Sequence, residues 1–241
     1  MMTAMQVFLS GTFGQMIIVC LVVCMLGKRH IKVDYSSAIG MAAIIIAGAS
    51  SALWGIIVSN QYHHIALGEI LLNFFNINAM LRYYLAAFMF LVLDFGYLLF
   101  GGHIKIDHWY SPVLLFFKAI IFGGIEEIGW RFTFMPMAEA KIGFIGAVLC
   151  SFILWGIWHF LYFYVEGTLH QVQVFPFLLG LFTNCFILSA LYKYSGSLWI
   201  CVMTHAAINT LAQISERGNK YIALLGKAVI ILCACSIAMI L

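Results

Sequence analysis

The chain has 241 residues, of which 64% are hydrophobic and 9% charged, with a formal net charge of +3 at pH 7. Soluble globular domains carry about a quarter charged residues, so this composition excludes an ordinary water-soluble domain. Apolar residues extend over the whole length, which predicts a single integral-membrane domain, residues 1–241, that crosses the bilayer several times. Basic residues fall in short loops rather than in a stripe with aromatic residues, which argues against nucleic acid as a partner.

A bilayer core requires about 20 apolar residues per helix, and this length divides the chain into predicted membrane-spanning helices. The fold class is therefore all-α, a bundle of about eight transmembrane helices with an intramembrane polar site. The predicted spans are residues 6–26, 37–59, 79–101, 112–135, 142–165, 172–193, 197–213 and 221–240. The turn Pro136–Lys141 is expected to separate the fourth and fifth spans.

The connection 60–78 is long and carries apolar residues at helical spacing, which predicts an amphipathic helix at the membrane interface. Its apolar positions are Ile65, Leu67, Ile70, Leu71, Phe74 and Phe75.

Ionisable side chains are rare inside the predicted spans, where such residues usually face the bundle interior and mark functional sites. They are Asp94, Lys118, Glu126, Glu127, Arg131, His159 and His205. Asp94 near the end of the third span and Lys118 near the start of the fourth reach a similar depth. Two interpretations remain open: an Asp94–Lys118 ion pair, or a Lys118 side chain that extends to the interface.

The stretch GGIEEIGWRF, residues 123–132, contains two adjacent carboxylates and an arginine. On an α-helix Glu127 and Arg131, at i and i+4, share a face and are predicted to form an ion pair. Glu126 is rotated by about 100° from Glu127, so this pair does not satisfy it. A carboxylate in that position is a candidate general base for a water molecule. Three glycines are expected to let neighbouring helices or a substrate backbone approach: Gly123, Gly124 and Gly129.

Two further spans supply polar groups that could meet Glu126. The segment WGIWH, residues 155–159, contains His159, and THAAIN, residues 204–209, places His205 and Asn209 on one helical face. Either histidine alone is explained by a structural hydrogen bond, but polar groups on three spans favour a common site. Counted from the loops, Glu126 and His205 reach similar depths, whereas His159 lies roughly 10 Å deeper.

These segments match three ordered motifs: EEIGWR fits EExxxR, THAAIN fits HxxxN, and WGIWH stands where FxxxH is usual, with Trp155 in place of Phe. Together, within about residues 120–213, they resemble the intramembrane proteases of the CAAX-protease and bacteriocin-processing (CPBP, or Abi) family. This family includes the type II CAAX prenyl endopeptidase.

The resemblance implies peptide-bond hydrolysis by a water molecule activated within the membrane. Glu126 would be the general base, and His159 would orient or polarise the water. Glu127 and Arg131 would support this arrangement from the adjacent face.

In the same resemblance His205 and Asn209 would donate hydrogen bonds to the oxyanion of the tetrahedral intermediate. No cofactor is favoured, because HExxH is missing and a glutamate mechanism needs no metal. A divalent metal such as zinc is the alternative, with Glu126, His159 and His205 as its ligands.

The predicted substrate is a membrane-proximal peptide or a prenylated or otherwise lipidated protein tail, with membrane lipid as the surrounding partner. Compact spans without extensions favour a multi-pass protein of a prokaryotic cell (inner) membrane. Two other functions remain open. One is a transporter or channel that uses the buried Glu and His residues as a proton relay. The other is an inactive family member that acts as a membrane scaffold or regulator.

Overall fold

The structure is a computed structural model that describes residues 2–216 and 218–240. It is 82% helical, which confirms the all-α class. The chain forms two compact units. The first unit is Met1–Leu67 with Ile128–Leu181, and the second unit is Gly68–Glu127 with Phe182–Leu241. One boundary between the units therefore falls inside EEIGWR, between Glu127 and Ile128, and the single integral domain stays a prediction.

The elements follow one another along the described ranges in this order. The first half contains α1 (Ala4–Lys28), α2 (Ala38–Gly48), α3 (Ser50–His63), α4 (Leu67–Phe74), α5 (Leu81–Phe95), the 3₁₀-helix η1 (Gly96–Leu99), β1 (His103–Ile104), α6 (Ser111–Ala119) and the π-helix η2 (Ile120–Gly124). The second half contains the π-helix η3 (Ile128–Phe134), α7 (Met135–Glu166), the 3₁₀-helix η4 (Leu169–Gln171), α8 (Val174–Ser195), α9 (Leu198–Ile214), β2 (Ser215–Glu216) and α10 (Lys220–Ile240).

In the described residues, five helices are long and apolar enough to cross a membrane, or six if the bent pair α2 and α3 counts as one span. The five are Ala4–Lys28, Leu81–Leu99, Ile128–Glu166, Val174–Ser195 and Lys220–Ile240. The predicted spans 112–135 and 197–213 contain shorter apolar helices, Ser111–Gly124 and Leu198–Ile214. The prediction of eight spans is therefore approximate.

The predicted break between the fourth and fifth spans is present, but it lies at Gly143 and not at Pro136–Lys141, which is helical. Pro136 lies in the first turn of α7, where a missing N–H group costs no helical hydrogen bond. The helical dihedral angles are interrupted at Gly143 instead, with φ 69° and ψ 170°. Glycine adopts positive φ without a steric penalty, so the kink falls on the residue that tolerates it.

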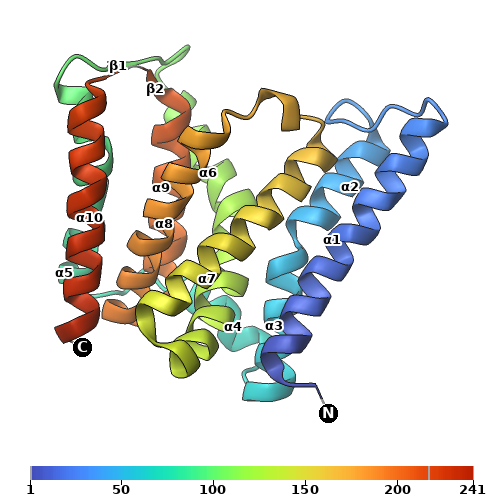
Figure 1. Cartoon of the computed structure of the whole chain (residues 1–241), viewed down its shortest axis with the longest axis horizontal. Coiled ribbons are helices and arrows are strands. Elements are labelled where there is room, and N and C mark those ends of the chain that lie inside the picture. The colour runs from blue at the N-terminus through green and yellow to red at the C-terminus, as the bar shows by residue number, and fades with distance from the viewer. Residues whose placement is uncertain (1, 217, 241) are drawn as a thin grey trace. The chain divides into compact units, whose positions relative to one another are not determined.

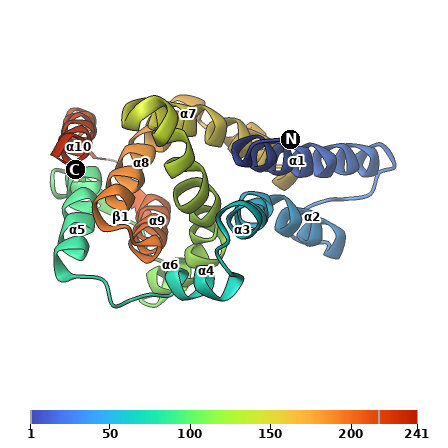
Figure 2. The ribbon, with the colours of Figure 1, turned by 90° about the horizontal axis from the view of Figure 1, so that it is seen from below.

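In the first unit, α1 packs against α2, α3 and α7, and it lies beside α2 and α3 in both views (Figure 1, Figure 2). Its N-terminus is closed by a capping box in which Thr3 and Gln6 each accept the other's backbone N–H. α3 and α7 both pack against η3, so the π-helical segment lies between two helices of the first unit.

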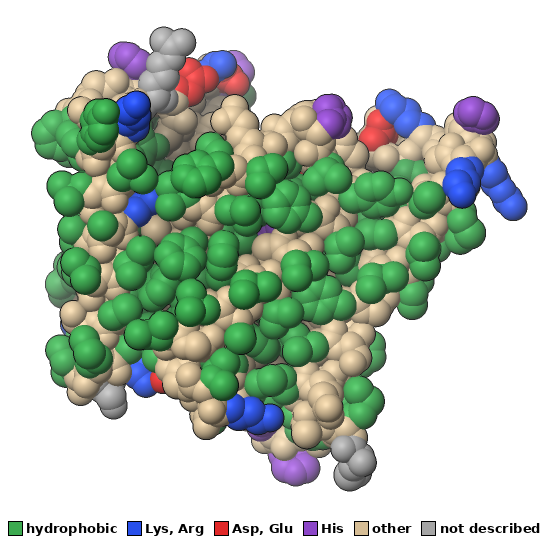
Figure 3. Space-filling view, in the orientation of Figure 1, with side chains coloured by type: hydrophobic (Ala, Val, Ile, Leu, Met, Phe, Trp, Pro, Cys, Tyr) green, Lys and Arg blue, Asp and Glu red, His purple; other side chains and the backbone are tan. Residues whose placement is uncertain are grey.

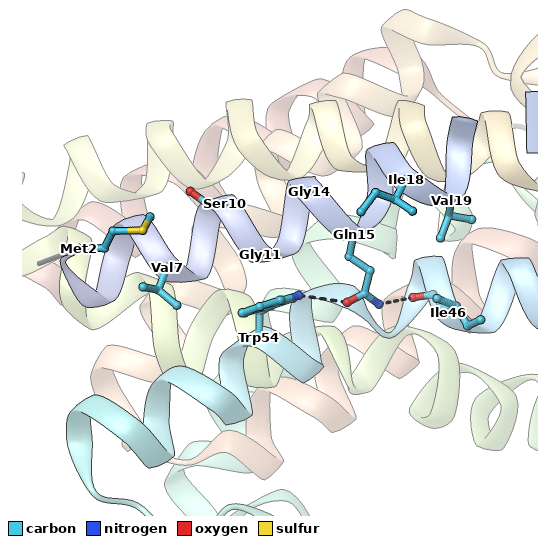
Figure 4. A pocket seen from close by; sticks show the side chains of 10 residues that line it. All are labelled: Met2, Val7, Ser10, Gly11, Gly14, Gln15, Ile18, Val19, Ile46 and Trp54. Atoms are coloured by element: carbon cyan, nitrogen blue, oxygen red, sulfur yellow. Dashed lines mark hydrogen bonds between the residues drawn. The ribbon is translucent and has the colours of Figure 1, made fainter. Parts of the chain in front are cut away.

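A polar side chain of α1 forms a hydrogen bond with a backbone group next to the break between α2 and α3, where the helix axis bends by 42°. Gln15 donates from Nε2 to the Ile46 carbonyl at 2.7 Å and accepts from Nε1 of Trp54 at 3.0 Å (Figure 4). Backbone groups freed by a broken helix must find partners inside a membrane, and Gln15 provides one. The same region lines an apolar groove of about 500 Å³ along α1 (Figure 4).

In the second unit, α9 packs against α5, α6 and η2, while α10 lies beside α5 (Figure 1, Figure 2). The strand β2 directly follows α9 and pairs antiparallel with β1, with His103 opposite Glu216. This short pairing connects the C-terminal end of α9 to the segment that follows η1.

The Asp94–Lys118 pair predicted from sequence is wrong. Oδ1 of Asp94 lies 2.7 Å from Nζ of Lys227 on α10, and Lys227 also donates to Oγ1 of Thr183 at 3.3 Å. Lys118 is exposed, and its extension to the interface stays a prediction. Lys227 lies inside the last predicted span and belonged among the intramembrane charges. Its position on a helix distant in sequence gave no local sign that it faces Asp94.

The surface of the helices is largely apolar. On the face shown in Figure 3, hydrophobic side chains cover the middle, whereas most charged and histidine side chains lie along the upper and lower edges. α4 confirms a helix in the 60–78 connection, with Ile70 and Phe74 buried and Leu72 75% exposed. A buried side and an apolar exposed side suit a helix at a membrane interface, although that location stays a prediction.

Candidate functional site

The two adjacent glutamates lie between two π-helical segments. η2 precedes them, and η3 begins directly after Glu127. A π-helix closes hydrogen bonds over five residues rather than four, and such segments occur frequently at functional sites. The Glu127–Arg131 pair was derived from α-helical spacing, which does not apply in η3, and it stays a prediction.

Glu127 is bonded to His205 of α9 within the second unit. Oε1 of Glu127 lies 2.7 Å from Nδ1 of His205, and their side chains are 0% and 4% exposed. With an ionised carboxylate as the acceptor, Nδ1 carries the proton and the ring orientation is fixed. The sequence argument reserved Glu127 for Arg131 and directed Glu126 toward the His205 face. The structure adds that Glu127 itself bonds His205 of α9, a contact that the sequence did not predict.

Gly123 lies where His205 and Asn209 face the π-helix η2. A Cβ atom on Gly123 would be 2.6 Å from Nδ2 of Asn209 and 3.3 Å from Nε2 of His205. A Cβ atom on Gly124 would likewise be 2.8 Å from Cγ1 of Val202. These distances confirm that the glycines permit close approach of a neighbouring helix. They also confirm that His205 and Asn209 share one face of α9.

Glu126 is buried, with 6% of its surface exposed. It belongs to the second unit with Glu127, His205 and Asn209. The second unit thus contains two buried carboxylates together with the two residues of the HxxxN motif.

Arg131 is fully buried in the first unit, against one face of α7. Its Nη1 atom donates to Oγ of Ser151 at 3.4 Å, and its Cζ atom lies 4.4 Å from the ring centroid of Trp155. A guanidinium over an indole face is a favourable cation–π arrangement, strongest when water is excluded. Trp155, the first residue of WGIWH, is therefore part of the environment of Arg131, and tryptophan is the aromatic residue that forms the strongest cation–π contacts.

His159 lies one helical turn after Trp155 and is half-buried. Its Nδ1 atom is 2.8 Å from the Trp155 carbonyl oxygen. A carbonyl oxygen only accepts, so Nδ1 carries the proton and Nε2 of the neutral ring is an acceptor. This tautomer suits a histidine that accepts a hydrogen bond from water.

The structure therefore brings the predicted site residues together in two groups. Glu126, Glu127, His205 and Asn209 lie in the second unit, and Arg131 and His159 lie in the first. Sequence reasoning missed the contact of Arg131 with Ser151 and Trp155. The available signal was Ser151, a serine at i−4 from Trp155 in a span with few polar side chains.

The described residues contain no group of three or more His, Cys, Asp and Glu side chains that could hold a metal ion. The ligand set of the zinc alternative, Glu126, His159 and His205, comes from both units. The metal-free mechanism and the zinc alternative therefore both stay predictions.

Comparison with known proteins gives one family. Residues 108–211 match the family model described as type II CAAX prenyl endopeptidase Rce1-like, and this segment contains all three motifs. No curated protein matches the chain. The long apolar helices and this family together identify an integral multi-pass membrane protein. Residues 108–211 are thus similar to the Rce1-like family of type II CAAX prenyl endopeptidases, as the three motifs predicted.

Proposed function

We propose that the protein is an intramembrane endopeptidase that cleaves a membrane-proximal peptide bond in a prenylated protein tail or peptide. The observation that carries this proposal is the buried Glu127–His205 hydrogen bond, formed beside Gly123 and Asn209 within the matched segment. Buried ionisable groups in hydrocarbon are costly, and their assembly on one face supports a catalytic use.

Glu126 is the proposed general base. It takes a proton from water as the water oxygen attacks the scissile carbonyl carbon, and the carbonyl electron pair moves to oxygen. When the intermediate collapses, the C–N bond breaks and Glu126 returns the proton to the leaving amine nitrogen. His159 accepts a hydrogen bond at Nε2 from the second hydrogen of the water, which stays on the water oxygen, a role supported by the bond that its Nδ1 makes to the Trp155 carbonyl.

His205 and Asn209 are the proposed oxyanion donors. His205 can donate from Nε2 when that atom carries a proton, and the bond between its Nδ1 atom and Glu127 fixes the orientation of the ring for this donation. Nδ2 of Asn209 and Nε2 of His205 both lie on the Gly123 side of α9, which supports a shared acceptor there. Donors of this kind contribute about 10²–10³ in kcat in a site that excludes water.

In the first unit, Arg131 is proposed to support the position of His159. The Arg131 side chain contacts Ser151 and holds the indole ring of Trp155 in place. The backbone carbonyl of the same tryptophan orients His159. In the metal-dependent alternative, a zinc ion bound by Glu126, His159 and His205 would supply a Lewis acid for the same water.

The test is cleavage by the purified protein in detergent or liposomes, with farnesylated CAAX-type peptides and their unprenylated counterparts. Wild type is expected to cleave and Glu126→Ala to lose activity. Activity that survives a strong chelator would remove the zinc alternative. Absence of cleavage combined with a proton flux that depends on Glu126 would favour the transporter, and absence of both would favour the scaffold.

A further inference from the structure

Helix α3 lies in direct backbone contact with the π-helical segment that follows Glu127. A Cβ atom on Gly55 of α3 would be 2.9 Å from Cα of Gly129. A Cβ atom on Gly129 would be 2.4 Å from the backbone oxygen of Ser51. Only glycine fits at both positions, because a methyl group on either would overlap the opposing backbone. Small residues that admit such approach are the usual means of tight helix packing in membranes.

A hydroxyl pair fixes the same contact one turn further along. Oγ1 of Thr133 lies 2.8 Å from the Ile128 carbonyl, 3.0 Å from Oγ of Ser59 and 3.3 Å from the Gly55 carbonyl. A threonine hydroxyl has one proton, and the shortest distance assigns it to the Ile128 carbonyl, so Ser59 donates to Thr133. Thr133 thereby bonds the carbonyl five residues before it, which is the interval of a π-helix.

α3 is itself held by contacts with α1 and α7. Trp54, next to Gly55, donates to Gln15 of α1, and its ring fills the space beside Gly11, where a Cβ atom would be 2.0 Å away (Figure 4). Ser50 at the start of α3 accepts from Nε1 of Trp158 on α7 at 2.8 Å. α3 therefore contacts η3 from a fixed position, and its own polar groups connect it to both α1 and α7.

We infer that Ser59 and Thr133 are positioning residues of the proteolytic site, through which α3 holds the π-helical form of Ile128–Phe134. This segment begins at the residue after the two glutamates and places Arg131 against Trp155 and Ser151. Without the Thr133 bond the Ile128 carbonyl loses its side-chain partner, and the segment can relax toward α-helical spacing. That change would rotate Arg131 away from α7. The inference rests on the proposed function, and α3 lies outside the family-matched residues.

The test compares Thr133→Val with Thr133→Ser and with Thr12→Val. Thr12 is the matched control because it is buried in α1 and its hydroxyl has no hydrogen-bond partner in the described part of the chain. Two readouts are measured on the whole protein: amide hydrogen exchange across residues 128–134, and kcat and KM for peptide cleavage. Loss of one buried hydrogen bond corresponds to about a tenfold change.

For Thr133→Val we expect about tenfold faster exchange in this segment and about tenfold lower kcat with KM unchanged. Thr133→Ser should restore both, and Thr12→Val should leave both at the wild-type value. If Thr133→Val does not fold, Ser59→Ala removes the hydroxyl that joins α3 to Thr133 while keeping the bond from Thr133 to the Ile128 carbonyl, and it is expected to change exchange and kcat in the same direction.

Two outcomes would overturn the inference: wild-type exchange in 128–134, or faster exchange with unchanged kcat. The second outcome would leave Thr133 a purely structural residue. If wild type cleaves nothing, the proposed function fails on its own, and exchange still decides whether Thr133 holds η3.

Discussion

The carboxylate of Glu127 and the imidazole of His205 meet at 2.7 Å, fully enclosed by protein, and connect the residue before η3 to the middle of α9. Breaking one partner of a buried, hydrogen-bonded charge pair is much more damaging than replacing both. Their contributions to catalysis are therefore expected to be coupled.

A double-mutant cycle measures this coupling. Glu127→Gln and His205→Ala are each expected to lower kcat by about 10²-fold, and the double variant should be no worse than either single variant. The reason is that Glu127 acts only through His205, so it has nothing to stabilise once the imidazole is removed. Additive losses would show that Glu127 has a separate catalytic role.

The second prediction concerns the close approach of η2 and α9. Gly123→Ala should lower activity by at least about tenfold, because the new methyl group would overlap Asn209 at 2.6 Å. Gly14→Ala is the matched control, since a Cβ atom there meets nothing within 4 Å. Steady-state cleavage by the two variants decides the matter, and equal activity would show that Asn209 moves aside without consequence.

The third prediction concerns Arg131. Arg131→Ala should lower both thermal stability and activity, because it removes the guanidinium from between Ser151 and Trp155. Trp155→Phe, which restores the aromatic residue usual in the motif, should cost only about 1 kcal/mol through a weaker cation–π contact. Melting temperatures in detergent provide the measurement. Unchanged stability of Arg131→Ala would contradict this assignment of its role.

The fourth prediction separates stability from chemistry in the second unit. Asp94→Asn should destabilise the protein by about 3 kcal/mol, because it leaves Lys227 charged and partly buried without its carboxylate. Adding Lys227→Met should recover most of the loss, and kcat should remain near the wild-type value throughout. Lys118→Met, at an exposed position, is the control and should change neither quantity. Loss of kcat in a folded Asp94→Asn protein would instead place Asp94 in the site.

Much of this organisation is readable from the sequence because membrane burial constrains residue choice so strongly. Long apolar runs predict the helices, and rare polar groups such as Glu127 and His205 predict where chemistry is concentrated. The close approach of Gly123 to α9 could also be predicted, because glycine in a membrane helix commonly marks a contact with a neighbouring helix.

The features that sequence reasoning missed depend on contacts between distant segments. The π-helical form of η3 has no local signature, because the Ile128 carbonyl is held by Thr133 in a contact shared with α3. Helical spacing therefore assigned Glu127 to Arg131 and overlooked His205. Lys227 was missed as the partner of Asp94 for the same reason, as α10 and α5 meet only in the folded chain.

The most direct measurement is cleavage of a farnesylated CAAX-type peptide by the wild-type protein and by Glu126→Ala, Glu126→Gln and Thr12→Val variants of equal thermal stability. We expect product from wild type and Thr12→Val, and at least about a 10²-fold loss of kcat in both Glu126 variants, because general-base catalysis contributes about that much. Cleavage that continues at the wild-type rate in Glu126→Ala would contradict the central claim that this carboxylate activates the water.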